Sequence, residues 1–407
     1  LLQSQGKVKG SVVPRVAEKL AYYRRDEDDR WAAELMDSKS HLMGFRNGVY
    51  DFSECCFRPG QADDYITNST KIRYREWSTY NPATQRQLTE FLERLMPEED
   101  AYEFLMRRIA LSLNGSLPKI QFAIFTGKGA NGKSKLVQMI SESFGGYFGI
   151  IAAEFFTEKP PSANSPREEL MAVIGKRFMS CPEVGGQQNT MHLSTIKVVT
   201  GDDLMEARGL YGKQLKFKPQ CQWCIQCNDL PVFPISSGDE AMDRRAEPHD
   251  FKSKFTRNPR LLAQNQGPNP ERRIYKALGD REMKELASVF KESFMSYLVH
   301  RYKDFKDTDE PEMPAASKVL LDEVLKGNLD CFDVFVKEAI ECDESCFIST
   351  VELFTEFQAF FKRSGIPARR TRIFNSFKKE MATLPQFPQV DGPGGEKGWQ
   401  IRVRHHM

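Results

Sequence analysis

The 407-residue sequence predicts an α/β core, with a mostly helical segment before it and an α+β module after it. Residues 119–235 alternate short apolar strands with helical stretches, which is typical of a parallel sheet covered by helices. A glycine-rich turn follows the first of these strands and opens a helix. We therefore expect a helical domain at 1–114, an α/β domain at 115–306 and a C-terminal module at 317–407.

The composition is that of an ordinary globular chain. Hydrophobic residues make up 40% and charged residues 28%, and the formal net charge is only +2. Any basic surface for nucleic acid must therefore be local. The sequence has no membrane-length apolar run, no signal peptide and no repeating framework among its nine cysteines, which together predict an intracellular protein with reduced thiols. Because the first residue is Leu1, we expect a fragment, or a chain numbered from its first ordered residue.

The sequence pattern of the N-terminal part changes from helical to hairpin-like and back to helical. Residues 1–40 have helical spacing and a run of mixed charge, which is typical of a solvated helix face. Asn47-Gly48 lies among aromatic and β-branched residues and predicts a short hairpin. Residues 84–114 return to helical spacing, and Asn114-Gly115 marks the predicted end of that helical stretch.

The strongest motif is Gly127-Lys128-Gly129-Ala130-Asn131-Gly132-Lys133-Ser134, which matches the Walker A pattern at all four fixed positions. A strand-like stretch precedes it and an amphipathic helix follows. Glycines let backbone N–H groups turn toward phosphate oxygens, and the helix N-terminus adds partial positive charge. We expect these eight residues to bind ATP, with Lys133 on the β- and γ-phosphates and the Ser134 hydroxyl on Mg²⁺. The alternative is a chance glycine turn.

Two polar residues that follow later strands are candidates for water activation. Glu183 ends the strand-like stretch 175–184, and we expect it to orient the attacking water and to act on Mg²⁺. The alternative is a surface carboxylate, because Pro182 stands where a second acid is often found. Asn228 ends the stretch 220–229 and is expected to hold the water and sense the γ-phosphate.

Arg244 and Arg245 are candidates for an arginine supplied to the ATP of a neighbouring subunit. A guanidinium in that position neutralises charge that develops on the phosphates. This role requires a ring of subunits. The alternative is a surface pair neutralised by Asp243 or Glu247.

We reject a zinc site at Cys221, Cys224 and Cys227. These residues lie three apart in a strand-like run, and no second cysteine pair or nearby histidine pair completes four ligands.

The order of these motifs resembles superfamily 3 helicases, a branch of the AAA+ ATPases. More specifically, it is similar to the primase-helicases of poxviruses and other large cytoplasmic DNA viruses, with relatives in phages. The resemblance rests on GANGKS at 129–134, on IKVVTGDD and ARGLYG within 196–212, and on RNGVYDF at 46–52. It covers residues 41–255 well and the rest loosely.

The resemblance implies an AAA+ core and a hexamer with ATP between subunits, translocating 3′ to 5′ on single-stranded DNA. It places Lys133, Ser134, Glu183, Asn228 and Arg244 or Arg245 at the ATPase positions of the family. A primase domain usually precedes the motor in these proteins; none is visible here, and we assign no primase activity to these residues. The resemblance also implies a place in the host cytoplasm, at the viral replication site, with other replication proteins as partners.

Residues 206–219 predict two strands joined by a tight turn, at the position where superfamily 3 motors project a hairpin into the pore. We expect Arg208, Lys213 and Lys216 to contact DNA phosphates, and Tyr211 to stack on a base or sugar. The alternative is a hairpin packed inside its own subunit.

The C-terminal module has a helix, a turn at Gly365-Ile366-Pro367, a second helix and a terminal strand at 398–404. This order predicts a winged-helix-like fold. Seven lysines and arginines lie within 362–380, so the module either grips DNA or braces the subunit.

We interpret the chain as the ATP-hydrolysing motor of a DNA helicase that acts on single-stranded or forked DNA. Two alternatives stay open. A small-molecule kinase of the P-loop type would share the glycine-rich loop, but it would not need Asn228, the arginine pair or the hairpin. A DNA-binding ATPase scaffold would bind DNA without unwinding it.

Overall fold

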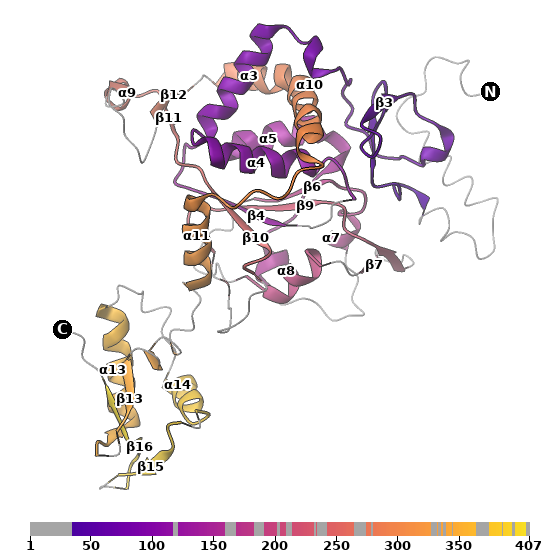
Figure 1. Ribbon diagram of the computed structural model, residues 1–407. Helices are drawn as coiled ribbons and strands as arrows, with labels where there is room; N and C mark the ends of the chain where they lie inside the picture. The colour runs from indigo at the N-terminus through magenta and orange to yellow at the C-terminus, as the bar shows by residue number, and fades with distance from the viewer. Residues whose placement is uncertain are drawn as a thin grey trace. The chain divides into compact units, whose positions relative to one another are not determined.

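The computed structural model divides the chain into two compact units, Leu1–Pro231 with Ala241–Leu321 and Val232–Glu240 with Asp322–Met407 (Figure 1). It describes residues 35–116, 121–158, 168–182, 191–201, 204–208, 214–231, 233, 242–263, 274–277, 280–326, 332, 335–336, 339–343, 345–363, 374–384, 386–392 and 395–403. Of the charged helical segment predicted at 1–40, residues 1–34 lie outside this range. The predicted domain boundaries stay predictions.

A five-stranded parallel sheet forms the centre of the first unit. Its strands are β4 (Phe122–Thr126), β5 (Phe148–Ile150), β6 (Phe178–Cys181), β9 (Gln222–Gln226) and β10 (Ala246–Asp250). Their order is β10-β4-β9-β6-β5, and every neighbouring pair is parallel. The predicted α/β core with a parallel sheet is therefore confirmed, and its first strand, β4, lies between β9 and β10.

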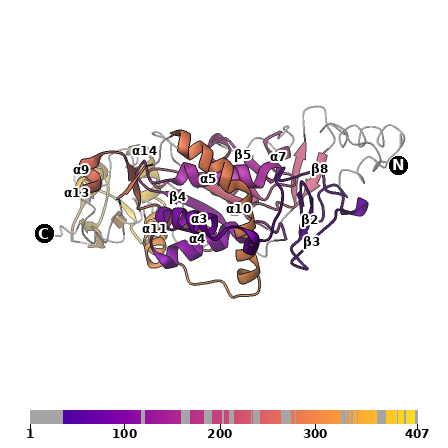
Figure 2. The same cartoon turned by 90° about the horizontal axis from the view of Figure 1, so that it is seen from above.

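Helices cover both faces of this sheet, which is why β4 is buried along its whole length. One face carries α3 (Pro82–Leu95), α4 (Glu99–Leu111), α5 (Lys133–Phe144) and α10 (Asp280–Phe305), which Figure 2 shows lying over the strands. The other carries α6 (Glu154–Thr157), α7 (Glu168–Met171) and α8 (Leu193–Val199).

Alternate residues of each strand supply the two cores. Phe122 and Trp223 contact the Phe156 ring of α6, with centroids 5.2 and 5.7 Å away, and the Trp223 indole N–H donates to the Val199 carbonyl at 3.1 Å. Ala123, Phe125 and Cys224 face the opposite way, into the cluster formed with α4, α5 and α10. Each fully buried aromatic side chain of this kind stabilises the fold by roughly 1.5–3 kcal/mol.

The predicted N-terminal hairpin is confirmed, but its turn lies one residue earlier. Strands β1 (Leu42–Phe45) and β2 (Gly48–Asp51) are antiparallel, and β3 (Cys56–Arg58) completes the sheet. Phe45 pairs with Gly48, so Arg46 and Asn47 form the turn. The Asn47 side chain accepts from the Tyr74 N–H at 2.8 Å and donates to the Tyr74 carbonyl at 3.0 Å, which holds the turn against a distant segment.

The helical stretch predicted at 84–114 consists of two helices, α3 and α4, which are separated by 96–98. Pro97 lies in this break, and proline disfavours a helical conformation of the residue before it. α4 ends at Leu111, three residues before the predicted end. Because α10 packs against α3, α4 and α5, the N-terminal helices and the parallel sheet share one core.

Several smaller elements complete the first unit. β7 (Met205–Arg208) pairs antiparallel with β8 (Gln214–Phe217), and β11 (Lys254–Thr256) pairs parallel with β12 (Ile274–Lys276). Helix α9 (Pro259–Ala263) and the short 3-10 turns η1 (Ala62–Asp64), η2 (Trp77–Thr79) and η3 (Gly145–Tyr147) fill the connections, and α11 (Ala315–Lys326) leads into the second unit.

The second unit contains α13 (Thr350–Arg363) and α14 (Phe374–Met381), which pack through phenylalanines such as Phe357 and Phe377. The predicted terminal strand is two strands. β16 (Lys397–Trp399) pairs with β14 (Ile348–Ser349) and β15 (Gln389–Asp391), whereas β17 (Ile401–Val403) pairs with β13 (Ile340–Cys342). The chain changes sheet at Gln400, a change that an alternating pattern does not reveal. The predicted turn at 365–367 lies outside the described residues.

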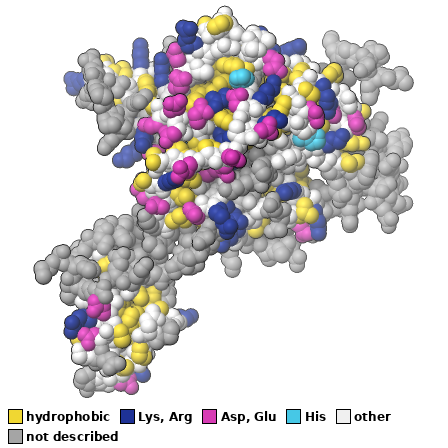
Figure 3. Space-filling view, viewed as in Figure 1, with side chains coloured by type: hydrophobic (Ala, Val, Ile, Leu, Met, Phe, Trp, Pro, Cys, Tyr) yellow, Lys and Arg dark blue, Asp and Glu magenta, His cyan; other side chains and the backbone are white. Residues whose placement is uncertain are grey.

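The described helices include none with both the length and the apolar character needed to cross a membrane. On the face shown in Figure 3, acidic and basic side chains are interspersed over the helical layer of the first unit, in keeping with the small net charge.

His249 makes the stability of the first unit sensitive to acid. Its ring is buried beside Phe104, at 5.3 Å, and Phe125, at 5.5 Å, and burial together with the charge of Arg108 lowers its pKa to about 3. The unfolded chain, with a histidine pKa of about 6.5, binds a proton between these two values and the folded chain does not. This contribution to stability is complete above pH 6.5 and falls by about 1.4 kcal/mol per pH unit below it.

We expect His249→Phe to reduce the loss of unfolding free energy between pH 7.5 and pH 5 by about 2 kcal/mol. Urea unfolding at the two pH values measures it. The exposed His300 on α10 provides the control, and His300→Gln should keep the wild-type pH dependence. An unchanged pH dependence in His249→Phe would contradict the assignment.

Candidate functional site

The glycine-rich loop joins β4 to α5, so the predicted strand, loop and helix follow one another as expected. β4 ends at Thr126 and α5 begins at Lys133. Because β9 and β10 run parallel to β4 on its two sides, their carboxyl ends reach the same edge of the sheet as the loop. This is the edge where open α/β sheets bind their ligands.

The loop conformation depends on glycine at two positions. Gly127 has φ +131° and Gly132 has φ +91°, and Ala130, with φ +62°, is also left-handed. A Cβ on Gly127 would lie 2.7 Å from the Phe251 carbonyl oxygen and from Asn131 Nδ2, and one on Gly132 would lie 2.1 Å from Leu95 Cδ2. Gly129 differs, because a Cβ there meets nothing within 4 Å.

The segment that leaves β10 holds the loop from one side. The Phe251 N–H donates to the Thr126 carbonyl at 3.0 Å, and the Phe255 N–H donates to the Ala130 carbonyl at 2.7 Å. The buried Asn131 side chain donates to the Phe251 carbonyl at 3.2 Å and accepts from the Lys133 N–H at 3.4 Å. Asn131 therefore connects the loop to β10, a role that the motif pattern did not indicate.

Lys133 and Asn228 come together beside this loop. The buried Lys133 ammonium donates to the Gly127 carbonyl and, at 3.4 Å, to Asn228 Oδ1. Asn228 is held in place because the N–H of the preceding Cys227 donates to the Phe125 carbonyl at 3.0 Å. Lys128, Gly129 and Ser134 are exposed. A buried ammonium beside a helix N-terminus and an open glycine turn suits a polyphosphate.

Arg244 and Arg245 lie at the opposite edge of the sheet. The Phe122 N–H, at the amino end of β4, donates to the Arg245 carbonyl at 2.8 Å. The loop starts at the carboxyl end of the same strand, about 13 Å away at 3.3 Å per residue. The two arginines are therefore not brought to the phosphate loop of their own chain. Glu247, one of the two acids considered as their partner, binds Arg108.

The predicted acid, Glu183, lies outside the described residues. β6 ends at Cys181, and Pro182 is the last residue described before it. Because β6 is parallel to β9, the chain leaves it at the edge that carries the phosphate loop. The roles assigned to Glu183 and to the Ser134 hydroxyl on Mg²⁺ stay predictions.

The three clustered cysteines are buried in and around β9. Burial raises the pKa of the Cys221 and Cys224 thiols, which opposes the thiolate form that ligates metals. No group of three or more histidine, cysteine or acidic side chains that could hold a metal ion occurs among the described residues.

The predicted hairpin at 206–219 is present, with Arg208 on β7 opposite Gln214 on β8. Lys216 is exposed and forms an ion pair of 3.0 Å with Glu206 across the hairpin. The side chain of Arg208, and Tyr211 and Lys213, lie outside the described residues. Of the C-terminal basic cluster, Lys378 and Lys379 are described, and both are exposed.

Comparisons with known proteins point to one group of viral proteins. Residues 9–97 match the family described as D5 N terminal like. The chain is 29% identical to a protein of Acanthamoeba polyphaga mimivirus named "Putative helicase", over 67% of this chain and 28% of that protein. It is 30% identical to one of Invertebrate iridescent virus 6 with the same name, over 54% and 23%. A protein of African swine fever virus named "Putative primase" is 24% identical over 56% and 23%.

The chain is therefore similar to proteins of large DNA viruses that are named putative helicases and putative primases. It spans about a quarter of the length of these relatives. Among solved structures, the apo NrS-1 C-terminal region aligns with 15% identity and a TM-score of 0.41, over 82% of this chain and 78% of that one. Overlap at that level supports no argument about the site.

The two loop glycines provide a matched pair for testing the backbone geometry. We expect Gly127→Ala to lower the free energy of unfolding by about 1–3 kcal/mol, because it places a side chain at a left-handed φ against the Phe251 carbonyl. Gly129→Ala, with open space around it, should stay within about 0.5 kcal/mol of wild type. Urea unfolding measures both, and equal effects at the two positions would argue against this loop conformation.

Proposed function

We propose that this chain is the ATP-hydrolysing motor of a DNA helicase of the superfamily 3, AAA+ type. The meeting of Lys133 with Asn228 at the carboxyl edge of a parallel sheet carries the proposal. The names of the viral relatives support the assignment to DNA replication.

In this proposal the triphosphate lies over residues 127–134. Lys133 exchanges the Gly127 carbonyl for oxygens of the β- and γ-phosphates, and the N-terminus of α5 faces the same oxygens. Mg²⁺, when bound through Ser134 and Glu183, supplies charge neutralisation on the phosphate oxygens. Glu183 and Asn228 orient the water that attacks the γ-phosphorus.

The position of the arginine pair supports an assembly with ATP between subunits. Since Arg245 adjoins the amino end of β4, neither arginine serves the loop of its own chain, and one of them is proposed to reach the ATP of the next chain. A closed ring, which we propose to be a hexamer, gives every loop such a neighbour.

DNA contacts are assigned to the hairpin of β7 and β8. Arg208, Lys213 and Lys216 would follow the phosphates of one strand while Tyr211 stacks on it, and the other strand is excluded. The pairing of Lys216 with Glu206 at 3.0 Å partly neutralises one of these charges. The C-terminal unit, with a winged-helix-like order of α13, α14, β15 and β16, is proposed as a further DNA contact.

Strand displacement tests the proposed activity. The chain should hydrolyse ATP faster when single-stranded DNA is added and should release a labelled strand from a forked duplex. Lys133→Ala should lower both activities by about 100-fold or more, because it removes the cation on the phosphates. Phosphoryl transfer to a metabolite, indifferent to DNA, would instead identify a kinase. Hydrolysis without strand release would identify a scaffold.

Mixed assemblies test the arginine in trans. We expect Arg244→Ala or Arg245→Ala to abolish hydrolysis while ATP binding, followed with a fluorescent analogue, stays near wild type. Mixing the inactive arginine variant with Lys133→Ala should restore activity, because one type of interface then combines an intact loop with an intact arginine. Mixtures that stay inactive at every ratio would refute action between subunits.

A further inference from the structure

β10 physically connects the two groups that the proposed function assigns to adjacent ATP sites. The strand begins directly after Arg245. It ends at Asp250, and the next residue, Phe251, accepts from Asn131 of the phosphate loop at 3.2 Å. One short strand thus has the arginine pair at one end and the loop contact at the other.

β10 lies at the edge of the described sheet, so only β4 pairs with it there. Helix α4 also holds β10, through side-chain contacts. Glu247 and His249 lie two residues apart and face this helix, where the Arg108 guanidinium donates to both Glu247 oxygens, from Nε at 2.5 Å and from Nη2. Arg108 and Glu247 are 7% and 3% exposed. A forked contact of this kind fixes position along the strand as well as distance.

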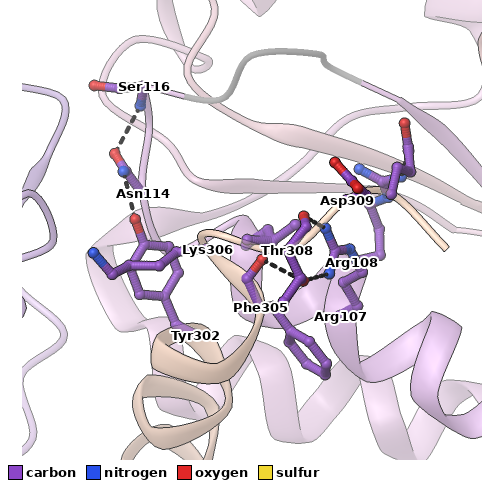
Figure 4. A pocket seen from close by; sticks show the side chains of 11 residues that line it. Arg107, Arg108, Asn114, Ser116, Tyr302, Phe305, Lys306, Thr308 and Asp309 are labelled. Atoms are coloured by element: carbon purple, nitrogen blue, oxygen red, sulfur yellow. Dashed lines mark hydrogen bonds and ion pairs between the residues drawn. The ribbon is translucent and has the colours of Figure 1, made fainter.

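The same arginine also holds the segment that follows α10. Arg108 Nη2 donates to Glu310 Oε1 at 2.8 Å. The preceding residue, Arg107, donates to the Thr308 hydroxyl at 2.5 Å and to its carbonyl at 2.7 Å. Figure 4 shows these side chains around a cavity of about 430 Å³ between the ends of α4 and α10. The two adjacent arginines therefore differ, since Arg108 reaches β10 and Arg107 reaches Thr308 in the segment after α10.

We propose that Arg108 is a positioning residue for ATP hydrolysis, which couples neighbouring sites by fixing β10 through Glu247. This inference rests on the proposed function. In this proposal, filling of the phosphate loop displaces Asn131 and Phe251. Because Arg108 joins β10 to α4 through Glu247, the strand moves without sliding along the helix, and the displacement reaches Arg244 and Arg245 at the next ATP. Arg108 touches neither nucleotide.

Arg108→Lys tests the proposal, because it keeps the charge and loses the two-oxygen fork. We expect kcat for ATP to fall about tenfold, the dissociation constant of an ATP analogue to change by less than about threefold, and the Hill coefficient to fall to about 1. Arg107→Lys is the matched control, with the same change on the adjacent residue, and should keep the wild-type kcat and Hill coefficient.

Two further variants keep the test decisive. Glu247→Asp shortens the same contact from the other side and should reproduce the split between kcat and binding. If the Arg108 variant does not fold, Asn131→Ala breaks the other end of the connection and leaves the ion pair intact; it should also bring the Hill coefficient to about 1.

The outcomes separate the two proposals. If the wild-type chain neither hydrolyses ATP nor responds to DNA, the proposed function itself is wrong. If the wild-type chain hydrolyses ATP and Arg108→Lys behaves like Arg107→Lys, or if the wild-type Hill coefficient is already 1, the helicase assignment stands and the coupling through β10 is wrong.

Discussion

The parallel register of β10, β4 and β9 is the constraint on which the site depends. Parallel strands bring equivalent ends to one edge, so Asn228 after β9 and Phe251 after β10 both adjoin the loop that follows β4. Because β10 runs parallel to β4, the residues that precede it, Arg244 and Arg245, lie at the amino edge of the sheet. An antiparallel β10 would have placed the arginine pair beside its own phosphate loop. Direction of pairing, rather than any single side chain, thus separates the two halves of the proposed catalytic group.

A buried arginine holds the N-terminal sheet of β1, β2 and β3 against the parallel sheet of the first unit. Arg177, just before β6, is 1% exposed, and it donates to the carbonyls of Ser40 at 2.9 Å and Leu42 at 3.2 Å and to the Gln220 side chain. A buried charge is costly unless hydrogen bonds replace its water, and these oxygens do so for the two Nη groups of Arg177. Burial nevertheless lowers its pKa, with the Tyr147 ring 5.3 Å away. Ser40 and Leu42 lie in the segment that matches the family described as D5 N terminal like, so Arg177 holds that segment on the parallel sheet.

Local patterns predicted what local forces decide. The apolar run of β4, the glycine turn and the amphipathic α5 are read directly from neighbouring residues, as is the hairpin of β7 and β8. Two details that depend on distant partners were wrong. The hairpin turn, predicted at Asn47-Gly48, lies one residue earlier, where Asn47 binds Tyr74. The terminal strand, predicted as one, is two strands that separate at Gln400.

The same limit applies to the site. Lys133 was predicted from the glycine-rich motif, and Asn228 from a polar residue at the end of a strand-like stretch. The two meet because the carboxyl ends of the parallel strands β4 and β9 lie at one edge of the sheet. Arg108 and Glu247 are 139 positions apart in the sequence. No spacing rule predicts that Arg108, and not the adjacent Arg107, binds this carboxylate. Asn131 occupies a variable position of the motif, so only its contact with Phe251 reveals its role.

The choice of an ion pair between α4 and β10 needs a reason beyond stability. Well-packed apolar residues usually hold two elements together as firmly as a buried ion pair does, because removing two charges from water is costly. Apolar contacts, however, tolerate sliding, whereas a fork on two carboxylate oxygens has one best position. An edge strand with a single ladder is where such a slide is easiest. Fixing β10 by Arg108 therefore keeps the distance between the loop contact and the arginine pair constant, which a motor that times one site by its neighbour requires.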